Sequence, residues 1–207
     1  MKYDLDVHRH RFSVWAAARA TQRGLCDVDV LREALDSCGV VDFIARHDLV
    51  SFDSSNFRGL HGSWCAGVLR VLKAHGIAGA SFGHAAKLVA MYLKSMVVLG
   101  PCTATPFAHV AHPPIDSILL GTLRTRCDCG RSHDWAKVNW TQLDEAGYYT
   151  LVDNLRGCLA TDDPFWKLEQ YWAPKATVGP NKRVQRTHSR VTPRAERLHG
   201  SRRAARR

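Results

Sequence analysis

The chain has 207 residues, 45% of them hydrophobic, which is enough to bury the core of one domain or at most two. Its net charge of +10 is concentrated at one end, because residues 175–207 hold 11 of the 29 Lys and Arg and one of the 19 acids, which leaves 18 of each sign in residues 1–174. A neutral body gives no electrostatic reason to expect a nucleic-acid partner, and the longest apolar run, residues 88–99, is shorter than the about 20 residues that cross a membrane.

The cysteines and the N-terminus indicate the compartment. The chain has seven cysteines, an odd number, and most of them are scattered between helical segments rather than grouped as in a small disulfide framework. Residues 1–6 are charged and lack the apolar stretch of a secretion signal. We therefore expect a cytoplasmic protein with reduced thiols and no membrane partner.

The first half of the chain predicts three helices. Residues 7–22 include three consecutive alanines and no glycine or proline, which favours a helix. Asp27 or Asp29 can cap a second helix, and Gly39 stands where a left-handed residue commonly ends one. After a polar connector, residues 57–75 carry apolar side chains at helical spacing: Leu60, Trp64, Val68 and Leu72.

The best-defined helix is predicted in the middle of the chain. The turn Gly76-Ile77-Ala78-Gly79 precedes residues 82–99, which Ser81 can cap and Gly100-Pro101 ends. This segment is apolar nearly all round, so we expect it at the centre of the core.

The remaining elements of the body are also helical. Pro113-Pro114 favours the first turn of a shorter helix that reaches Leu123, and a polar loop follows. Asp144 can cap another helix, and residues 165–172 form the last segment. Because the sequence has neither an internal repeat nor alternation of period two, residues 1–174 are predicted to be an all-α, single compact multi-helix domain.

Residues 175–207 are predicted to be a separate, disordered basic tail. They contain one Leu, three Val and no aromatic residue, which is too little apolar surface to offset the entropy of ordering. Residues 180–194 resemble a stretch that recurs at the ends of unrelated bacterial proteins, where it looks like a translated repetitive element. The alternative is a basic arm that binds nucleic acid.

The first candidate for chemistry is a stripe on the central helix. His84, Lys87, Met91 and Lys94 are three, four and three residues apart, so they share one side of a helix that is otherwise apolar. A lysine in apolar surroundings can act as a nucleophile or base, or bind a phosphate. The other interpretation is that the stripe simply faces solvent.

The second candidate is Asp116, in the segment His112-Pro113-Pro114-Ile115-Asp116. It is predicted within the first turn of a helix, where a carboxylate is favoured for structural reasons alone. It can also point into a cleft, where it would orient a nucleophile or stabilise a developing cation.

The glycine turn, the lysine and the proline-flanked aspartate together resemble the helix-hairpin-helix DNA glycosylases over residues 68–123. The resemblance implies that Gly76 to Gly79 binds DNA phosphates through backbone N–H groups, that Lys87 attacks the anomeric carbon of the sugar, and that Asp116 assists. The order of the lysines, the Asp116 segment and Trp140-Thr141 is also similar to a layout in uncharacterised bacterial helical proteins, which implies no activity.

A third candidate lies in the polar loop, where Cys127, Cys129 and His133 are residue types that bind zinc. A structural site needs a fourth ligand, for which Cys102, His109 and His112 are available. The competing interpretation is a flexible loop with free thiols, and we expect neither a bound metal nor a cofactor.

The fourth candidate is one side of the first helix, where His8, Arg11, Trp15 and Arg19 fall together. Such a basic and aromatic surface can contact phosphates or stack on a base, or it can be ordinary surface packing.

Two functions of different class follow from these candidates. The leading hypothesis is a non-catalytic helical domain that binds DNA, RNA or a protein partner. The alternative is a DNA glycosylase or lyase-like enzyme that uses Lys87 and Asp116 as catalytic residues. The residues predicted to bind nucleic acid are Gly76, Gly79, His84, Lys94, Arg11 and Trp15.

Overall fold

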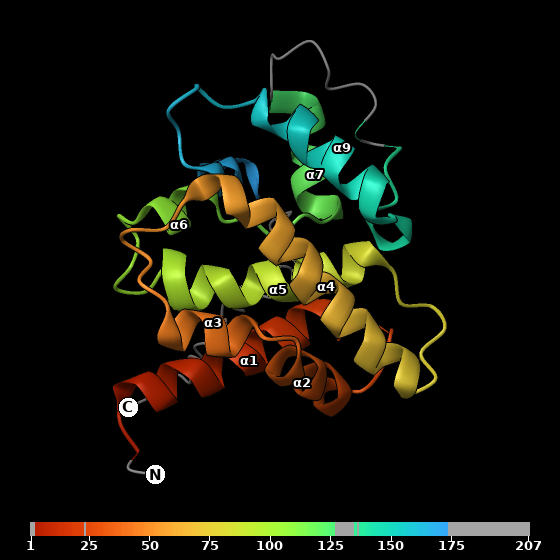
Figure 1. Cartoon of the computed structure of the whole chain (residues 1–207). Helices are drawn as coiled ribbons and strands as arrows, with labels where there is room; N and C mark the ends of the chain where they lie inside the picture. The colour runs from red at the N-terminus through yellow and green to blue at the C-terminus, as the bar shows by residue number, and fades with distance from the viewer. Residues whose placement is uncertain (1–2, 23, 127–134, 136, 174–207) are drawn as a thin grey trace, which may run out of the picture. The chain divides into compact units, whose positions relative to one another are not determined.

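The fold is organised around α5 (Phe82–Leu93), which lies across the middle of the molecule (Figure 1). Every residue of this helix except Met91 is buried, as its apolar composition predicts. The computed structural model describes residues 3–22, 24–126, 135 and 137–173. The predicted tail and the candidate zinc ligands Cys127, Cys129 and His133 lie outside the described residues.

Two groups of helices enclose α5. On one side of it in Figure 1 lie α1 (Leu5–Gln22), α2 (Val28–Ser37) and α3 (Val40–Arg46), and on the other lie α7 (Ser117–Arg126) and α9 (Glu145–Arg156). The remaining elements are η1 (Ser54–Asn56), α4 (Phe57–Ala74), η2 (Lys94–Val98), α6 (Pro106–Val110), η3 (Trp140–Gln142) and η4 (Phe165–Tyr171). The all-α prediction is confirmed for the part of the chain that the structure describes.

The core forms where these helices meet α5. Leu35 of α2, Leu72 of α4 and Leu88 of α5 are completely buried. Burying one such side chain contributes about 1.5–3 kcal/mol to folding. Among the described residues, no helix is both long enough and apolar enough to cross a membrane.

Side-chain caps fix several of the helix starts. Ser81 accepts a hydrogen bond from the backbone N–H of His84, whose ring accepts one from the N–H of Ser81, so the two residues form a capping box. Asp144 accepts from the N–H of Gly147 at 2.8 Å and caps α9. Both caps were predicted, because serine and aspartate satisfy the N–H groups that a first turn leaves without partners.

One predicted boundary is confirmed, and two others differ from the prediction. Gly39, with φ 94°, follows the end of α2 as predicted, and it also precedes α3, a short helix that the sequence did not predict. The central helix does not continue regularly to residue 99, since α5 ends at Leu93 and η2 is a π-helical turn in which Leu99 donates to the carbonyl oxygen of Lys94 at 2.8 Å. The prolines at 113 and 114 do not open α7, which begins at Ser117.

The true start of α7 is set by Asp116. One carboxylate oxygen, Oδ1, accepts from the backbone N–H groups of Ile118 and Leu119, each at 3.0 Å. Asp116 therefore stands before the first turn as its cap, not within it as predicted. The Asp116 carboxylate provides a hydrogen-bond partner for two backbone N–H groups of the first turn, whereas prolines are compatible with a first turn but provide no such partner.

Candidate functional site

Lys87 and Asp116 form a buried ion pair between α5 and the start of α7. Lys87 Nζ lies 3.2 Å from Asp116 Oδ2, and the two side chains are 3% and 6% exposed. The sequence analysis predicts these two residues as a catalytic pair, and the fold brings them into contact although they are 29 residues apart in the chain. The interpretation of the stripe as a solvent-facing surface is wrong for Lys87.

The carboxylate of Asp116 is held by both of its oxygens. While Oδ1 caps α7, Oδ2 accepts from Lys87 and also from the indole Nε1 of Trp172 at 3.4 Å. Burial opposes ionisation of this group, but the N–H of Leu119, the charge of Lys87 and the two side-chain hydrogen bonds outweigh it, so the pKa of Asp116 is lowered. The carboxylate form of Asp116 is therefore favoured.

Aromatic rings border the ammonium. Lys87 Nζ lies 4.6 Å from the centre of the Trp140 ring, at the distance of a cation–π contact. Trp140 reaches this position because η3 packs directly on the first turn of α5, where Gly83 donates to the carbonyl of Leu143 at 3.2 Å. A side chain at Gly83 would collide with the carbonyl of Trp140, so close packing here requires glycine.

Lys94 forms a second ion pair on the same side of α5. Its Nζ lies 2.6 Å from Glu169 Oε1 of η4, and both side chains are partly buried. Burial raises the pKa of Glu169, Lys94 counteracts this, and the charge of Asp116 raises it further. The carboxylates of Glu169 and Asp116 thus belong to one electrostatic cluster with Lys87 and Lys94.

His84 completes this side of α5 but does not face solvent. It is buried, its ring centre lies 5.4 Å from that of Trp140, and it takes part in the capping box with Ser81. Burial, and then the charge of Lys87, lower the pKa of His84. The structure therefore places His84 in the first turn of α5 and not on the solvent-facing surface.

The glycine turn lies between α4 and α5. Gly76 has φ 72°, and the N–H of the next residue, Ile77, returns to the carbonyl of Leu72 at 3.0 Å, which closes the end of α4. Gly79 has no left-handed φ, and a side chain added there would meet nothing. The backbone therefore requires glycine at position 76 but not at position 79.

The side of α1 predicted to bind nucleic acid is exposed. Trp15 is 49% exposed, its ring lies 6.0 Å from that of Phe12, and the guanidinium of Arg11 lies 5.3 Å from the ring of Tyr3. The opposite side of α1 packs against the rest of the molecule through Val14 and Ala17, among others. This surface exists as predicted, but His84 and Lys87 do not extend it.

A buried cluster of histidines and tyrosines was not predicted. His61 of α4 and His112 have ring centres 4.6 Å apart. The Nδ1 of His61 lies 3.0 Å from the hydroxyl of Tyr149, and that of His112 lies 3.1 Å from the hydroxyl of Tyr148. One signal was present in the sequence, since His61 lies three residues before Trp64 on the apolar side of its predicted helix.

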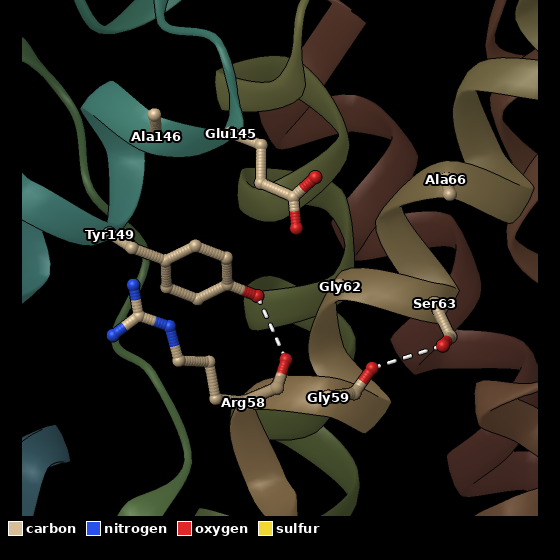
Figure 2. Close-up of a pocket in the computed structure, with 8 residues that line it drawn as sticks. All are labelled: Arg58, Gly59, Gly62, Ser63, Ala66, Glu145, Ala146 and Tyr149. Carbon is tan, nitrogen blue, oxygen red and sulfur yellow. Dashed lines mark hydrogen bonds between the residues drawn. The ribbon is translucent and has the colours of Figure 1, made fainter.

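This cluster backs onto a surface pocket of about 640 Å³ between α4 and α9, shown in Figure 2. The hydroxyl of Tyr149 donates to the carbonyl of Arg58 at 3.0 Å, and the Arg58 guanidinium lies 4.2 Å from the centre of the Tyr149 ring. Glu145 directs its carboxylate into the space between the two helices (Figure 2). The pocket therefore has one cationic and one anionic side.

No family model, no curated protein and no solved structure matches this chain. Across the residues placed by the structure, no group of three or more His, Cys, Asp or Glu is arranged to hold a metal ion. The function must therefore be inferred from the geometry of the site.

Proposed function

We propose that this protein is an enzyme of the DNA base-excision type, resembling the helix-hairpin-helix glycosylases and lyases, with Lys87 as nucleophile and Asp116 as its proton partner. The single observation that carries the proposal is the 3.2 Å contact between Lys87 Nζ and Asp116 Oδ2. The resemblance selected these two residues from the sequence independently of that contact.

The energetics of the pair favour a role in chemistry over one in stability alone. Two buried charges lose about as much in desolvation as they recover by attraction, so apolar residues of similar volume would serve the core at least equally well. An enzyme instead needs a lysine and a carboxylate in a water-poor site, where their charges act strongly. Lys87 and Asp116 meet this need.

The chemistry expected on an abasic site follows from the pair. Lys87 passes one proton to the Asp116 carboxylate, and the neutral amine adds to the C1′ aldehyde carbon of the ring-opened sugar. The resulting carbinolamine loses water and leaves an imine between Lys87 Nζ and C1′. During base release, the Asp116 carboxylate would instead stabilise positive charge that develops on the sugar.

Substrate access is expected to pass by Trp172. This side chain is 41% exposed, and its indole N–H occupies the same oxygen of Asp116 that contacts Lys87. A sugar that reaches Lys87 would have to displace the indole, after which the rings of Trp172 and Trp140 are available to stack on a base.

Trapping of the imine tests the proposal. The full-length protein is incubated with duplex DNA that contains one abasic site, and borohydride is added to deliver hydride to C1′ of the imine, which makes the link permanent. We expect a covalent protein–DNA adduct for the wild type and none for Lys87→Ala. Lys167→Ala is a matched control, because Lys167 also pairs with an aspartate, Asp163 at 2.6 Å, but on the surface.

A second assay covers an enzyme that releases bases without forming an imine. Duplexes with different damaged bases are incubated with the protein, and the freed base is measured for wild type and Asp116→Asn. If neither adduct nor free base forms with any substrate, the enzyme proposal fails. An adduct that persists in Lys87→Ala would show that Lys87 is not the nucleophile.

The second candidate function is a nucleic-acid-binding module that uses α1. It is favoured by the exposed Arg11 and Trp15, which supply a charge and a stacking surface on adjacent turns. In the full chain, Arg11→Ala and Trp15→Ala should each weaken binding to single-stranded DNA or RNA and leave base release unchanged. If neither change affects binding, α1 does not contact nucleic acid.

A further inference from the structure

A second cavity, of about 450 Å³, lies away from the Lys87 site, where α1 and α3 meet the C-terminal end of α5. Its walls are mainly apolar, with Val7 from α1, Val41 and Ile44 from α3, and Met96 from η2. Ligand sites in proteins typically combine a concave apolar wall of this size with a few polar groups that orient the ligand.

The polar lining of this cavity consists of the ion pair Asp6–Arg9, at 2.9 Å, and a hydrogen-bonded pair, His10 and Tyr92. The Nδ1 of His10 lies 3.1 Å from the hydroxyl of Tyr92, and both residues line the cavity. On the other side of the imidazole, Asp36 Oδ1 lies 3.9 Å from Nε2. In the tautomer with the proton on Nε2, His10 Nδ1 accepts from Tyr92, whose oxygen keeps lone pairs for a further donor.

Tyr92 remains a neutral phenol. Burial raises its pKa, and the neighbouring Asp36 and Cys38 raise it further. The side chain is almost completely buried, so the cavity is its route to an additional partner. A hydroxyl group that enters the cavity can donate to the Tyr92 oxygen, and its apolar remainder can lie along Val41 and Met96.

The backbone beside this cavity is irregular. Met96 belongs to η2, the π-helical turn at the end of α5, where the N–H of Leu99 reaches back five residues to Lys94. Such turns are rare inside helices and occur frequently at functional sites. Here the turn joins the two sites, because Lys94 faces Glu169 while Met96 lines the cavity.

We propose that this cavity binds a small, mainly apolar molecule that carries one hydroxyl group, with the hydroxyl on the His10–Tyr92 pair. The site is separate from the Lys87–Asp116 pair and does not depend on the function proposed above. It provides a second ligand site between α1, α3 and the end of α5.

Two probes that differ by a single hydroxyl test this site. Naphthalene and 1-naphthol share an apolar body that is small enough for the cavity, and their binding to the full-length protein is measured by equilibrium dialysis. We expect 1-naphthol to bind about fivefold more tightly, which is the gain from one neutral hydrogen bond of about 1 kcal/mol. Tyr92→Phe removes the oxygen that would accept from the ligand, so it should retain binding of naphthalene and lose the preference for 1-naphthol.

A pair of Ala→Trp variants locates the binding. Ala45 lines this cavity and Ala66 lines the pocket of Figure 2, so each tryptophan fills one of the two spaces. Ala45→Trp should abolish binding of both probes, and Ala66→Trp should leave it unchanged. Thermal unfolding by circular dichroism identifies variants that do not fold, and Tyr92→Phe then decides the result alone.

Several outcomes overturn the proposal. Equal affinity for the two probes would exclude the His10–Tyr92 pair as the hydroxyl site. Loss of binding in Ala66→Trp, with Ala45→Trp unaffected, would place the probes in the other pocket. Absence of binding by either probe would exclude a site of this chemistry.

Discussion

Lys87 Nζ lies 3.2 Å from Asp116 Oδ2 at a point where both side chains are almost completely buried. The contact joins the central helix to the start of α7 and makes each residue dependent on the other. Removing one partner would leave a charge in the core without compensation. The pair therefore links stability to the chemistry proposed for the site.

Replacing one member of this pair should destabilise the protein strongly. We expect Lys87→Met and Asp116→Leu to lower the free energy of unfolding by about 3–5 kcal/mol each, because each leaves one buried charge. The double variant should recover most of the loss, since it leaves neither charge, apart from the cap that Asp116 provides to α7. Urea unfolding of the four proteins measures the coupling. Losses that simply add would show that the two side chains do not act as a pair.

Gly83 should tolerate no side chain. Gly83→Ala forces the first turn of α5 away from the carbonyl of Trp140, and overpacking of this kind costs about 1–3 kcal/mol. Gly121→Ala is the control, because Gly121 lies inside α7 with open space around it and alanine is favoured in helices by up to about 1 kcal/mol. The measurement is the free energy of unfolding. Equal effects of the two changes would show that η3 does not pack on Gly83 as described.

The helices themselves could be predicted because their signals are local. Ser81 and Asp144 are capping residues next to apolar segments of helical period, and the structure uses both as caps. The central position of α5 could be predicted because the helix is apolar nearly all round, whereas the burial of His84 and Lys87 could not be predicted. A lysine in an otherwise apolar helix is expected to face solvent as long as its acidic partner is not known.

The parts that could not be predicted depend on contacts between distant segments. The position of Asp116 before α7 follows from two N–H groups that its carboxylate caps, whereas the prolines before it were the stronger local signal. The amino-acid composition gives no signal of the π-helical turn after Leu93. The pairing of His61 with Tyr149 spans 88 residues, so neither residue could indicate the other.

The hydrogen bond between His61 and Tyr149 should contribute measurably to stability. Tyr149→Phe removes the hydroxyl that lies 3.0 Å from His61 Nδ1 and leaves the buried ring nitrogen without that partner. An unsatisfied buried polar group costs about 1–3 kcal/mol. Tyr3→Phe is the control, because Tyr3 is exposed and should change stability by less than about 0.5 kcal/mol. If the two variants unfold at the same urea concentration, the buried hydrogen bond is not formed in solution.

The buried histidines should make the protein sensitive to mild acid. Burial lowers the pKa of His61 to about 3, and burial together with His61 and nearby arginines lowers that of His112 well below its ordinary value. Both imidazoles are neutral in the folded state and take up a proton in the unfolded state below about pH 6.5. The unfolded state is therefore stabilised relative to the folded state as the pH falls. Stability should therefore be full above pH 6.5 and decline by about 1.4 kcal/mol per pH unit for each histidine between pH 6.5 and the folded-state pKa.

Urea unfolding at pH 7.0, 6.0 and 5.0 measures this decline, with His61→Gln as the variant that should flatten it. His75→Gln is the control, because His75 is partly exposed and lies 3.0 Å from Glu33 at the surface. Removing His75 should leave the decline in place, since it does not bury a neutral imidazole. A stability that stays constant from pH 7.0 to 5.0 in the wild type would mean that His61 and His112 take up protons in the folded protein, which their burial between Tyr148 and Tyr149 opposes.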